Sequence, residues 1–417
     1  MSSGRCLIYI ATPQVPKNHK MNKREMLHAV AAGLGTMLWP AQAGAATAAG
    51  AGGSGSAEIN AVVQHYAVLV HASYGDSLAA ALVMQQAIGA LLAQPSAASL
   101  KAARTAWIDA REWYGQTEAF RFYAGPVDDG KGPEQRMNTW PVDESYIDYV
   151  RDRPDSGLIN NPKAVLTKAA LAAANIRGGL ENVSTGWHAI EFLLWGQDLS
   201  ETGPGERPFE DFVDGKGVHA DRRRQYLAAV TELLLDDLRY LIAAWAPGAK
   251  ANYRAKFERG GLESVRRIVI GIGALSRAEL AGERMEVALN TQDQEDEQSC
   301  FSDNTHRDIV NNAIGIENVW LGRFKRRDGS LLQGPSLRDL VASSDAAQAE
   351  RTSRQIATSI AAAQAIHPPF DVEIRGSRSA PGPMRVRATI DSVLAQSREL
   401  GAAANAIGIT RLNMVKP

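Results

Sequence analysis

Hydrophobic residues recur along this chain with a helical period, and the alternating runs typical of strands are few. The pattern predicts helices over residues 57–93, 97–123, 163–176, 185–196, 219–246, 262–288, 305–321, 347–366 and 384–405. Ser96 is placed to cap the second of these, and Ser184 or Thr185 to cap the fourth. Because the chain is also rich in alanine and leucine, we predict an all-α fold.

The predicted helices form two groups on either side of residues 246–252, APGAKAN. The words IEFLLWG (190–196) and IENVWLG (316–322) align without gaps and suggest an internal duplication, although such short apolar words also recur by chance. Ile314 takes the place of His188 in the second copy, so a duplication would leave one site rather than two. We therefore expect an N-terminal helical domain over 57–247 and a C-terminal helical domain over 248–417.

The start of the chain has the features of an export signal. From Met21, a basic MNKREM precedes an apolar run and the small residues around Ala41-Gln42-Ala43. We predict a signal peptide over 1–46, with Met21 as an alternative true start, and a flexible leader over 47–56. The apolar run is short for a transmembrane span, and we expect no later segment to supply one. Export would place the protein in the periplasm or in an outer-membrane-associated part of the cell envelope.

Charge and cysteine content narrow the possible functions. The 45 basic and 46 acidic residues nearly cancel, so no electrostatic case for nucleic-acid binding follows. Of the two cysteines, only Cys300 lies after the predicted signal peptide, so we expect no intramolecular disulfide. Stability must then come from the helical core.

The segment STGWHAIEFLLWG, residues 184–196, is almost entirely apolar but contains His188 and Glu191. Positions three apart share one face of a helix, and buried ionisable groups need a partner. Because His188 would lie near the helix N-terminus, we expect a neutral imidazole beside an ionised Glu191, a state ready to bind a transition metal. A hydrogen-bonded structural pair is the commoner meaning of such a pattern.

Other polar residues could line a site around this pair. They are Glu118 and Arg121 at helical spacing, Trp140, Asp143 and Glu144 in MNTWPVDESYIDYV, and Glu297, His306 and Asp308 in the acidic segment 293–308. A solvated acidic loop anchored by aromatic side chains explains these patterns equally well. The metallopeptidase word HExxH is absent, and HAIEF lacks the second histidine of its inverted form.

Together these motifs resemble the imelysin family, also called insulin-cleaving metalloproteinase-like proteins of the bacterial envelope. Gly186, His188 and Glu191 match its GxHxxE signature. The words QTEAFRFYAGPVDD, MNTWPVDESYIDYV, GIGALSRAELAGERM, QDQEDEQSCFSDNTHRDIV and GPSLRDLV are similar to the branch typified by iron-regulated protein A. The resemblance implies two pseudo-symmetric helical bundles with the signature in a pocket near their interface.

The resemblance leaves three functions open. The first is binding of a metal, with iron favoured and zinc or copper as alternatives, or of a metal-bearing small ligand for iron acquisition with an envelope uptake partner. The second is a zinc-dependent endopeptidase that uses His188 and Glu191 as ligands. The third is a non-metal module that binds a peptide or polysaccharide.

Overall fold

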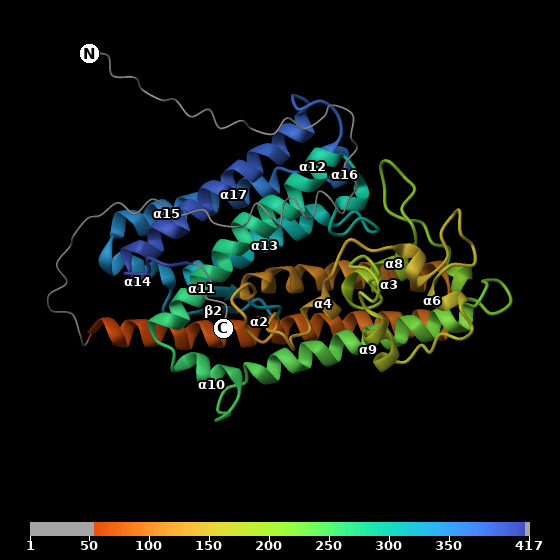
Figure 1. Cartoon of the computed structure of the whole chain (residues 1–417), viewed down its shortest axis with the longest axis horizontal. Coiled ribbons are helices and arrows are strands. Elements are labelled where there is room, and N and C mark those ends of the chain that lie inside the picture. Colours follow the sequence, from red (N-terminus) through yellow and green to blue (C-terminus); the bar gives the residue numbers. More distant parts are fainter. Residues whose placement is uncertain (1–53, 413–417) are drawn as a thin grey trace, which may run out of the picture. The chain divides into compact units, whose positions relative to one another are not determined.

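The computed structural model describes residues 54–412, and its first helices form a bundle around one core (Figure 1). Helix α2 (Ser54–Ala93) is followed by α3 (Ala97–Tyr114), which packs along it, and α9 (Ala220–Ala244) packs against α2. Ser96 and Ser99 form a reciprocal capping box that fixes the start of α3. The short helix α8 (Gly186–Trp195) lies against α3 and α9, and all ten of its residues are buried.

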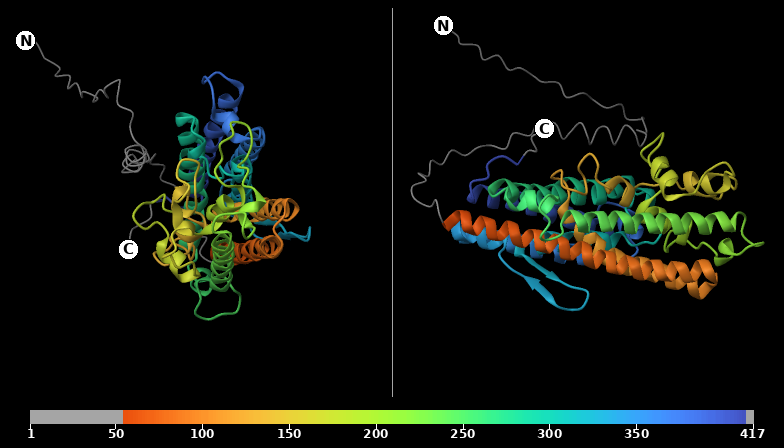
Figure 2. Two further views of the ribbon diagram at one scale, coloured as in Figure 1. Left: turned by 90° about the vertical axis from the view of Figure 1, so that its right-hand side faces the viewer. Right: turned by 90° about the horizontal axis from the view of Figure 1, so that it is seen from below.

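A second group of helices contains α11 (Leu262–Ala274), α13 (Thr305–Leu321), α15 (Ala346–Gln364) and α17 (Pro381–Ala406) (Figure 2). A π-helical segment, η3 (Leu275–Glu286), continues α11 and packs on α17. The remaining helices here are α10 (Tyr253–Glu258), α12 (Val287–Thr291), η4 (Gln294–Asp296), α14 (Leu337–Ser344) and α16 (Phe370–Ile374).

Irregular chain connects α3 to α8 and α8 to α9. It contains the short helices η1 (Gly115–Phe120), α4 (Glu134–Met137), α5 (Glu144–Ile147), α6 (Gly157–Asn160), α7 (Lys168–Ala174) and η2 (Phe209–Phe212). Helix α13 crosses η1 so closely that a Cβ on Gly315 would lie 2.3 Å from the carbonyl oxygen of Gln116. This crossing brings residues 305–312 next to those that follow Trp107 on α3.

The all-α prediction is confirmed, and the bounds of several helices differ from those expected. The predicted helix 97–123 ends its α-helical part at Tyr114, and the predicted helix 262–288 becomes π-helical at Leu275. A hairpin of β1 (Arg323–Lys325) and β2 (Leu331–Gln333) follows α13 and was not predicted. Residues 54–56 begin α2 rather than belonging to a leader.

Helix α2 corrects the expectation about membrane spans. By length and apolar composition alone, residues 55–93 could cross a membrane. In the described structure, 61% of the most apolar window of this helix is buried inside the protein, where it packs on α3 and α9. The predicted signal peptide over 1–46 and most of the predicted leader lie outside the described residues.

The predicted boundary at 247/248 falls in the connection between α9 and α10. The larger hydrophobic core takes residues from both sides of this point, from Val62 to Ile409. A smaller core is built entirely from residues between Leu280 and Val393. The division into two pseudo-symmetric domains stays a prediction. Each of the two aligned segments ends its helix at a glycine with positive φ, Gly196 in the first and Gly322 in the second. Glu317 of the second segment forms an ion pair with Arg323.

Candidate functional site

The first residue of α8 explains the glycine of the GxHxxE signature. Gly186 has a φ of +87°, and a Cβ there would lie 2.4 Å from the carbonyl oxygen of Met137 and 2.5 Å from that of Arg136. The preceding Thr185 does not cap α8 with its side chain, since its hydroxyl donates to the Arg136 carbonyl at 2.9 Å. Only glycine allows the 136–137 backbone to approach the start of α8 this closely.

His188 and Glu191 meet on the buried face of α8, as their spacing predicts. Nδ1 of His188 lies 2.7 Å from Oε2 of Glu191, and the two residues are 1% and 0% exposed. The backbone N–H and the hydroxyl of Ser302 donate to the other carboxyl oxygen at 3.0 and 2.6 Å. Nε2 of His188 is buried and has no hydrogen-bond partner among residues 54–412.

Burial changes the charge expected for this pair. Burial, followed by the nearby Arg111 charge, lowers the pKa of His188 well below its usual range, so the imidazole is neutral as expected. Burial also raises the pKa of Glu191 to about 8, although Ser302 and Arg111 oppose the shift. Desolvation therefore works against the ionised Glu191 that we expected from the position of the pair in its helix. Loss of one proton from the pair leaves Nδ1–H donating to the carboxylate and a lone pair on Nε2.

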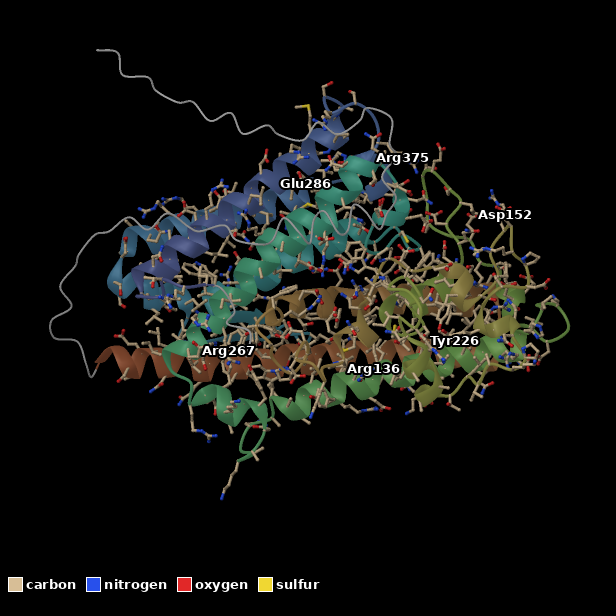
Figure 3. All side chains as sticks on the ribbon, viewed as in Figure 1. Arg136, Asp152, Tyr226, Arg267, Glu286 and Arg375 are labelled. Carbon is tan, nitrogen blue, oxygen red and sulfur yellow. The ribbon has the colours of Figure 1, made fainter. Side chains whose placement is uncertain are left out.

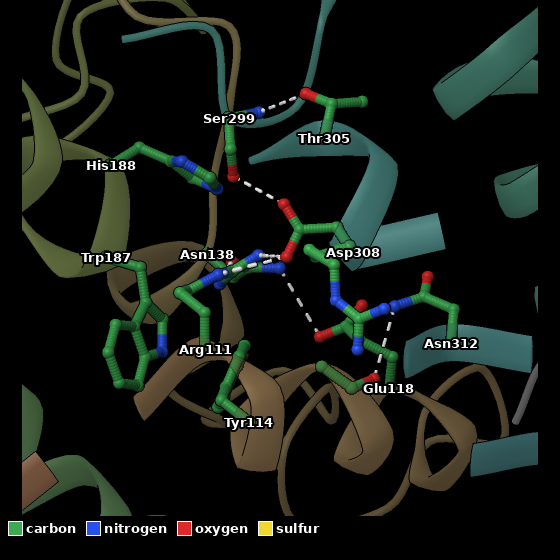
Figure 4. A network of polar contacts seen from close by, with 12 residues as sticks. Arg111, Tyr114, Glu118, Asn138, Trp187, His188, Ser299, Thr305, Asp308 and Asn312 are labelled. Carbon is green, nitrogen blue, oxygen red and sulfur yellow. Dashed lines mark hydrogen bonds and ion pairs between the residues drawn. The ribbon is translucent and has the colours of Figure 1, made fainter. Parts of the chain in front are cut away.

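A buried ion pair joins α3 to α13 beside His188 (Figure 4). Arg111 donates from Nε and Nη2 to Oδ1 of Asp308 at 3.1 and 2.7 Å, and from Nη1 to Oδ1 of Asn138 at 2.8 Å. The Ser299 hydroxyl donates to the second oxygen of Asp308. Asp308, a sequence candidate, thus serves as the counter-ion of Arg111.

The candidates Glu118 and Arg121 belong to the adjoining part of this network. Glu118 accepts from Arg121 and from Arg284 of the π-helical segment, both at 2.6 Å, and from Nδ2 of Asn138 at 3.3 Å. Burial opposes ionisation of Glu118, but the two guanidinium groups outweigh it and lower its pKa to about 2. Arg284, which lies in the π-helical segment η3, also donates to Asn312.

The remaining sequence candidates lie in other surroundings. Asp143 caps α5 through Ser145, and Trp140 is half-buried. Glu144 lies near Cys300. Burial raises the pKa of the Cys300 thiol well above its usual range, and the charges of Glu295 and of other carboxylates, Glu144 among them, add to this shift. The candidate His306 is half-buried, with Nδ1 3.1 Å from the carbonyl oxygen of Asp303, and Glu297 lies among other buried carboxylates.

Several residues of the site were not predicted, namely Arg111, Asn138, Ser299, Ser302, Arg284 and Asn312. The burial of Arg111 could have been predicted, because it falls on the same face of its helix as the buried Trp107 and Tyr114. The contact of Ser302 with Glu191 could not have been predicted from local sequence, since 111 residues separate them.

His188 is the side chain of this site whose surroundings resemble those of a metal ligand. A neutral histidine that is oriented through Nδ1 by a carboxyl group and leaves Nε2 without a partner has the form of a metal-binding histidine. Glu191 is occupied by His188 and Ser302, so it orients His188 in this structure. Within the described ranges, no three His, Cys, Asp or Glu side chains are arranged to hold a metal ion. In the described residues the site therefore presents one donor nitrogen without a partner, Nε2 of His188, and no set of three metal ligands.

Comparison with known proteins agrees with this signature. The family model described as imelysin, of the peptidase M75 group, matches residues 70–400, which is more than half of the chain. The chain belongs to the imelysin family. This imelysin is 28% identical over 308 residues to iron-regulated protein A of Synechococcus elongatus, a match that covers 73% of this chain and 75% of that relative.

Two solved structures share the fold of this imelysin. One is a putative iron-regulated protein A precursor from Parabacteroides distasonis, with a TM-score of 0.66 and 18% identity, covering 84% of this chain and 95% of that one. The other is an imelysin-like protein from Psychrobacter arcticum, with a TM-score of 0.62 and 14% identity, covering 85% and 96%. At these identities the likeness concerns the fold alone.

Proposed function

We propose that this imelysin is an exported envelope protein that binds a transition metal, with iron favoured, through Nε2 of His188. The observation that carries the proposal is the buried, neutral imidazole whose Nδ1 is held by Glu191 while Nε2 lacks a partner. Imidazole nitrogen suits iron, copper and zinc alike, and the names of the relatives favour iron. A bound metal would supply Lewis acidity, and Glu191 would keep the ring oriented.

The shortage of protein ligands favours a metal that arrives with its own small ligand. His188 offers one nitrogen donor, and the carboxylates of Glu118 and Asp308 are taken up by arginines. A metal bound by one imidazole alone would be held weakly, so the remaining positions call for a chelating molecule or water. This arrangement supports acquisition of a chelated metal. In our proposal the protein acts in the periplasm or in association with the outer membrane, and an envelope uptake partner takes the metal on.

The endopeptidase function receives less support from the same geometry. A peptidase of this kind needs a carboxylate that is free to take a proton from a metal-bound water. Glu191 holds His188 on one oxygen and Ser302 on the other, and Glu118 holds two guanidinium groups. In the described part of the chain, neither carboxylate is available for that role.

The test is the metal content of the full chain purified without chelator, before and after exposure to iron citrate, zinc and copper. We expect wild type to retain near-stoichiometric metal and His188→Ala to lose it. Glu191→Gln should bind about 10- to 100-fold more weakly, because it keeps the ring only loosely oriented. His367→Ala removes an exposed histidine and serves as the matched control, which should bind like wild type.

Absence of metal from wild type after every challenge would refute the proposal, as would full retention by His188→Ala. Cleavage of an unfolded peptide that a chelator abolishes would instead support the peptidase. Binding of an organic ligand by metal-free protein would support a non-metal module.

A further inference from the structure

The segment 250–267, KANYRAKFERGGLESVRR, concentrates positive charge at one edge of the protein. Six of its 18 residues are basic and two are acidic, whereas the whole chain has 45 basic residues in 417 and a formal net charge of -1. The segment contains the end of the connection after α9, all of α10, the turn that follows and the start of α11. In Figure 1, α10 and this connection form the lower edge of the bundle. We call residues 250–267 the basic edge.

The acidic residues of the basic edge do not neutralise it. Glu258 forms an ion pair with Arg254 at 2.8 Å. Glu263 accepts from two guanidinium groups, those of Arg266 at 2.7 Å and Arg267 at 3.4 Å. Because one carboxylate serves two arginines there, one positive charge is left over.

Three further basic residues add to this surplus. Lys250, Lys256 and Arg259 are exposed, and their side chains form no ion pair or hydrogen bond with residues 54–412. Lys256 and Arg259 are three residues apart at the end of α10, so they lie on one face of it. Together with the surplus guanidinium, the basic edge carries four positive charges without an acidic partner in the described chain.

The loop beside α10 does little to compensate these charges. Burial raises the pKa of Tyr253 in α10, and the charges of Asp128 and Asp129 add to the shift, so the loop 125–132 lies beside this helix. Asp129 is exposed but is balanced by the exposed Lys131 of the same loop. Asp128 accepts from two backbone N–H groups of its own segment. This loop therefore offsets at most one of the four charges.

Exposed apolar residues lie among the charges. Leu262 follows Arg259 after two glycines and is 41% exposed. Arg267, one turn further along α11, donates to the Tyr253 hydroxyl at 3.4 Å, and Figure 3 shows it on the side of the bundle where α10 lies. Basic groups around an exposed apolar side chain suit the surface of a lipid bilayer, where cations meet phosphate groups and apolar side chains meet the acyl boundary.

We propose that the basic edge docks this imelysin on a bilayer surface that contains anionic phospholipids. Charge complementarity identifies the occupant, since four unpaired cations spread over a helix and its flanking loops match many phosphate groups in a plane. Each basic group near such a surface strengthens binding about fivefold, so the docking is weak, reversible and sensitive to salt. It goes beyond the proposed metal binding and does not depend on it.

The test is sedimentation of the full chain with vesicles of phosphatidylcholine, with and without about one-third phosphatidylglycerol. We expect wild type to bind the anionic vesicles in low salt and to leave them in about 1 M NaCl, where charges are screened beyond about 3 Å. Lys250→Gln combined with Lys256→Gln and Arg259→Gln should weaken this binding about 100-fold, because three of the four unpaired charges are removed.

A matched variant controls for net charge. Lys101→Gln combined with Lys163→Gln and Arg177→Gln makes the same charge change on exposed residues of other segments, and it should bind anionic vesicles like wild type. All of these chains share the same N-terminal segment, so any contribution from it cancels in the comparison. His188→Ala should also bind like wild type, so the docking and the metal proposal can fail separately.

Three results would overturn the docking proposal. They are equal binding of wild type to neutral and anionic vesicles, no binding to either, and full binding by the variant that lacks Lys250, Lys256 and Arg259. Binding to dextran sulfate in solution without binding to anionic vesicles would also overturn it, and would indicate a soluble polyanion as the partner.

Discussion

Replacing Glu118 with glutamine should cost this protein several kcal/mol of stability near neutral pH. The carboxylate pairs with Arg121 and Arg284 at 2.6 Å each, and both guanidinium groups are largely buried. Its pKa falls from an ordinary 4.5 to about 2, and a difference of that size corresponds to about 3 kcal/mol. Removing one partner of a buried ion pair typically costs about 3–5 kcal/mol, so the two lines of reasoning agree.

The pH dependence gives this prediction its sharpest form. Because the folded pKa of Glu118 is lowered, its contribution is complete above about pH 4.5 and is lost as the pH falls toward 2. We expect the stability difference between wild type and Glu118→Gln, measured by urea unfolding with tryptophan fluorescence, to shrink steadily between pH 5 and about pH 3. Taking the difference cancels the titration of carboxylates common to both proteins.

A surface pair provides the control for Glu118. Glu112 binds Arg307 at 2.7 Å, but both side chains are about one-third exposed, so Glu112→Gln should cost less than about 1 kcal/mol. The reasoning is refuted if Glu118→Gln changes stability no more than Glu112→Gln does at pH 7. It is refuted equally by a difference that stays constant down to pH 3.

Two further variants or modifications test local features. Gly186→Ala should destabilise the protein by more than about 3 kcal/mol in urea unfolding, because it adds a backbone overlap to the strain of a positive φ. Gly215→Ala, also at positive φ but with nothing within 4 Å, should cost about 1 kcal/mol, and equal effects would contradict the overlap argument. Burial and the neighbouring Glu295 raise the pKa of Cys300 well above its usual range, so iodoacetamide at pH 8 should label it at least about 100-fold more slowly in native protein than in urea. Equal labelling rates in the two states would show that the thiol is accessible.

Local patterns were enough to predict most of the long helices and the contact at the centre of the site. Helix α13 has the bounds that its periodicity predicted, and His188 meets Glu191 because residues three apart share a helical face. Where the backbone left the α-helical period, prediction failed. Glu279 and Arg284 are five residues apart, which points them away from each other on an α-helix, yet they lie 2.9 Å apart in the π-helical segment.

The partners that complete the site come from distant parts of the sequence. Asp308 lies 197 residues beyond Arg111, and nothing local in either segment specifies the other. The rise in the pKa of Glu191 could not be predicted for a related reason. Its environment is set by residues packed around α8 and by Ser302, whereas the helix dipole was the only influence that the local sequence displayed.

The buried ion pairs make the early and late parts of this chain each other's counter-ions. Arg111 and Glu118 precede residue 247, and their partners Asp308 and Arg284 follow it. A fragment ending in the connection after α9 would therefore carry Arg111 without its carboxylate partner and Glu118 with one of its two arginines, Arg121. The parts of the chain before and after this connection therefore depend on each other to neutralise buried charge.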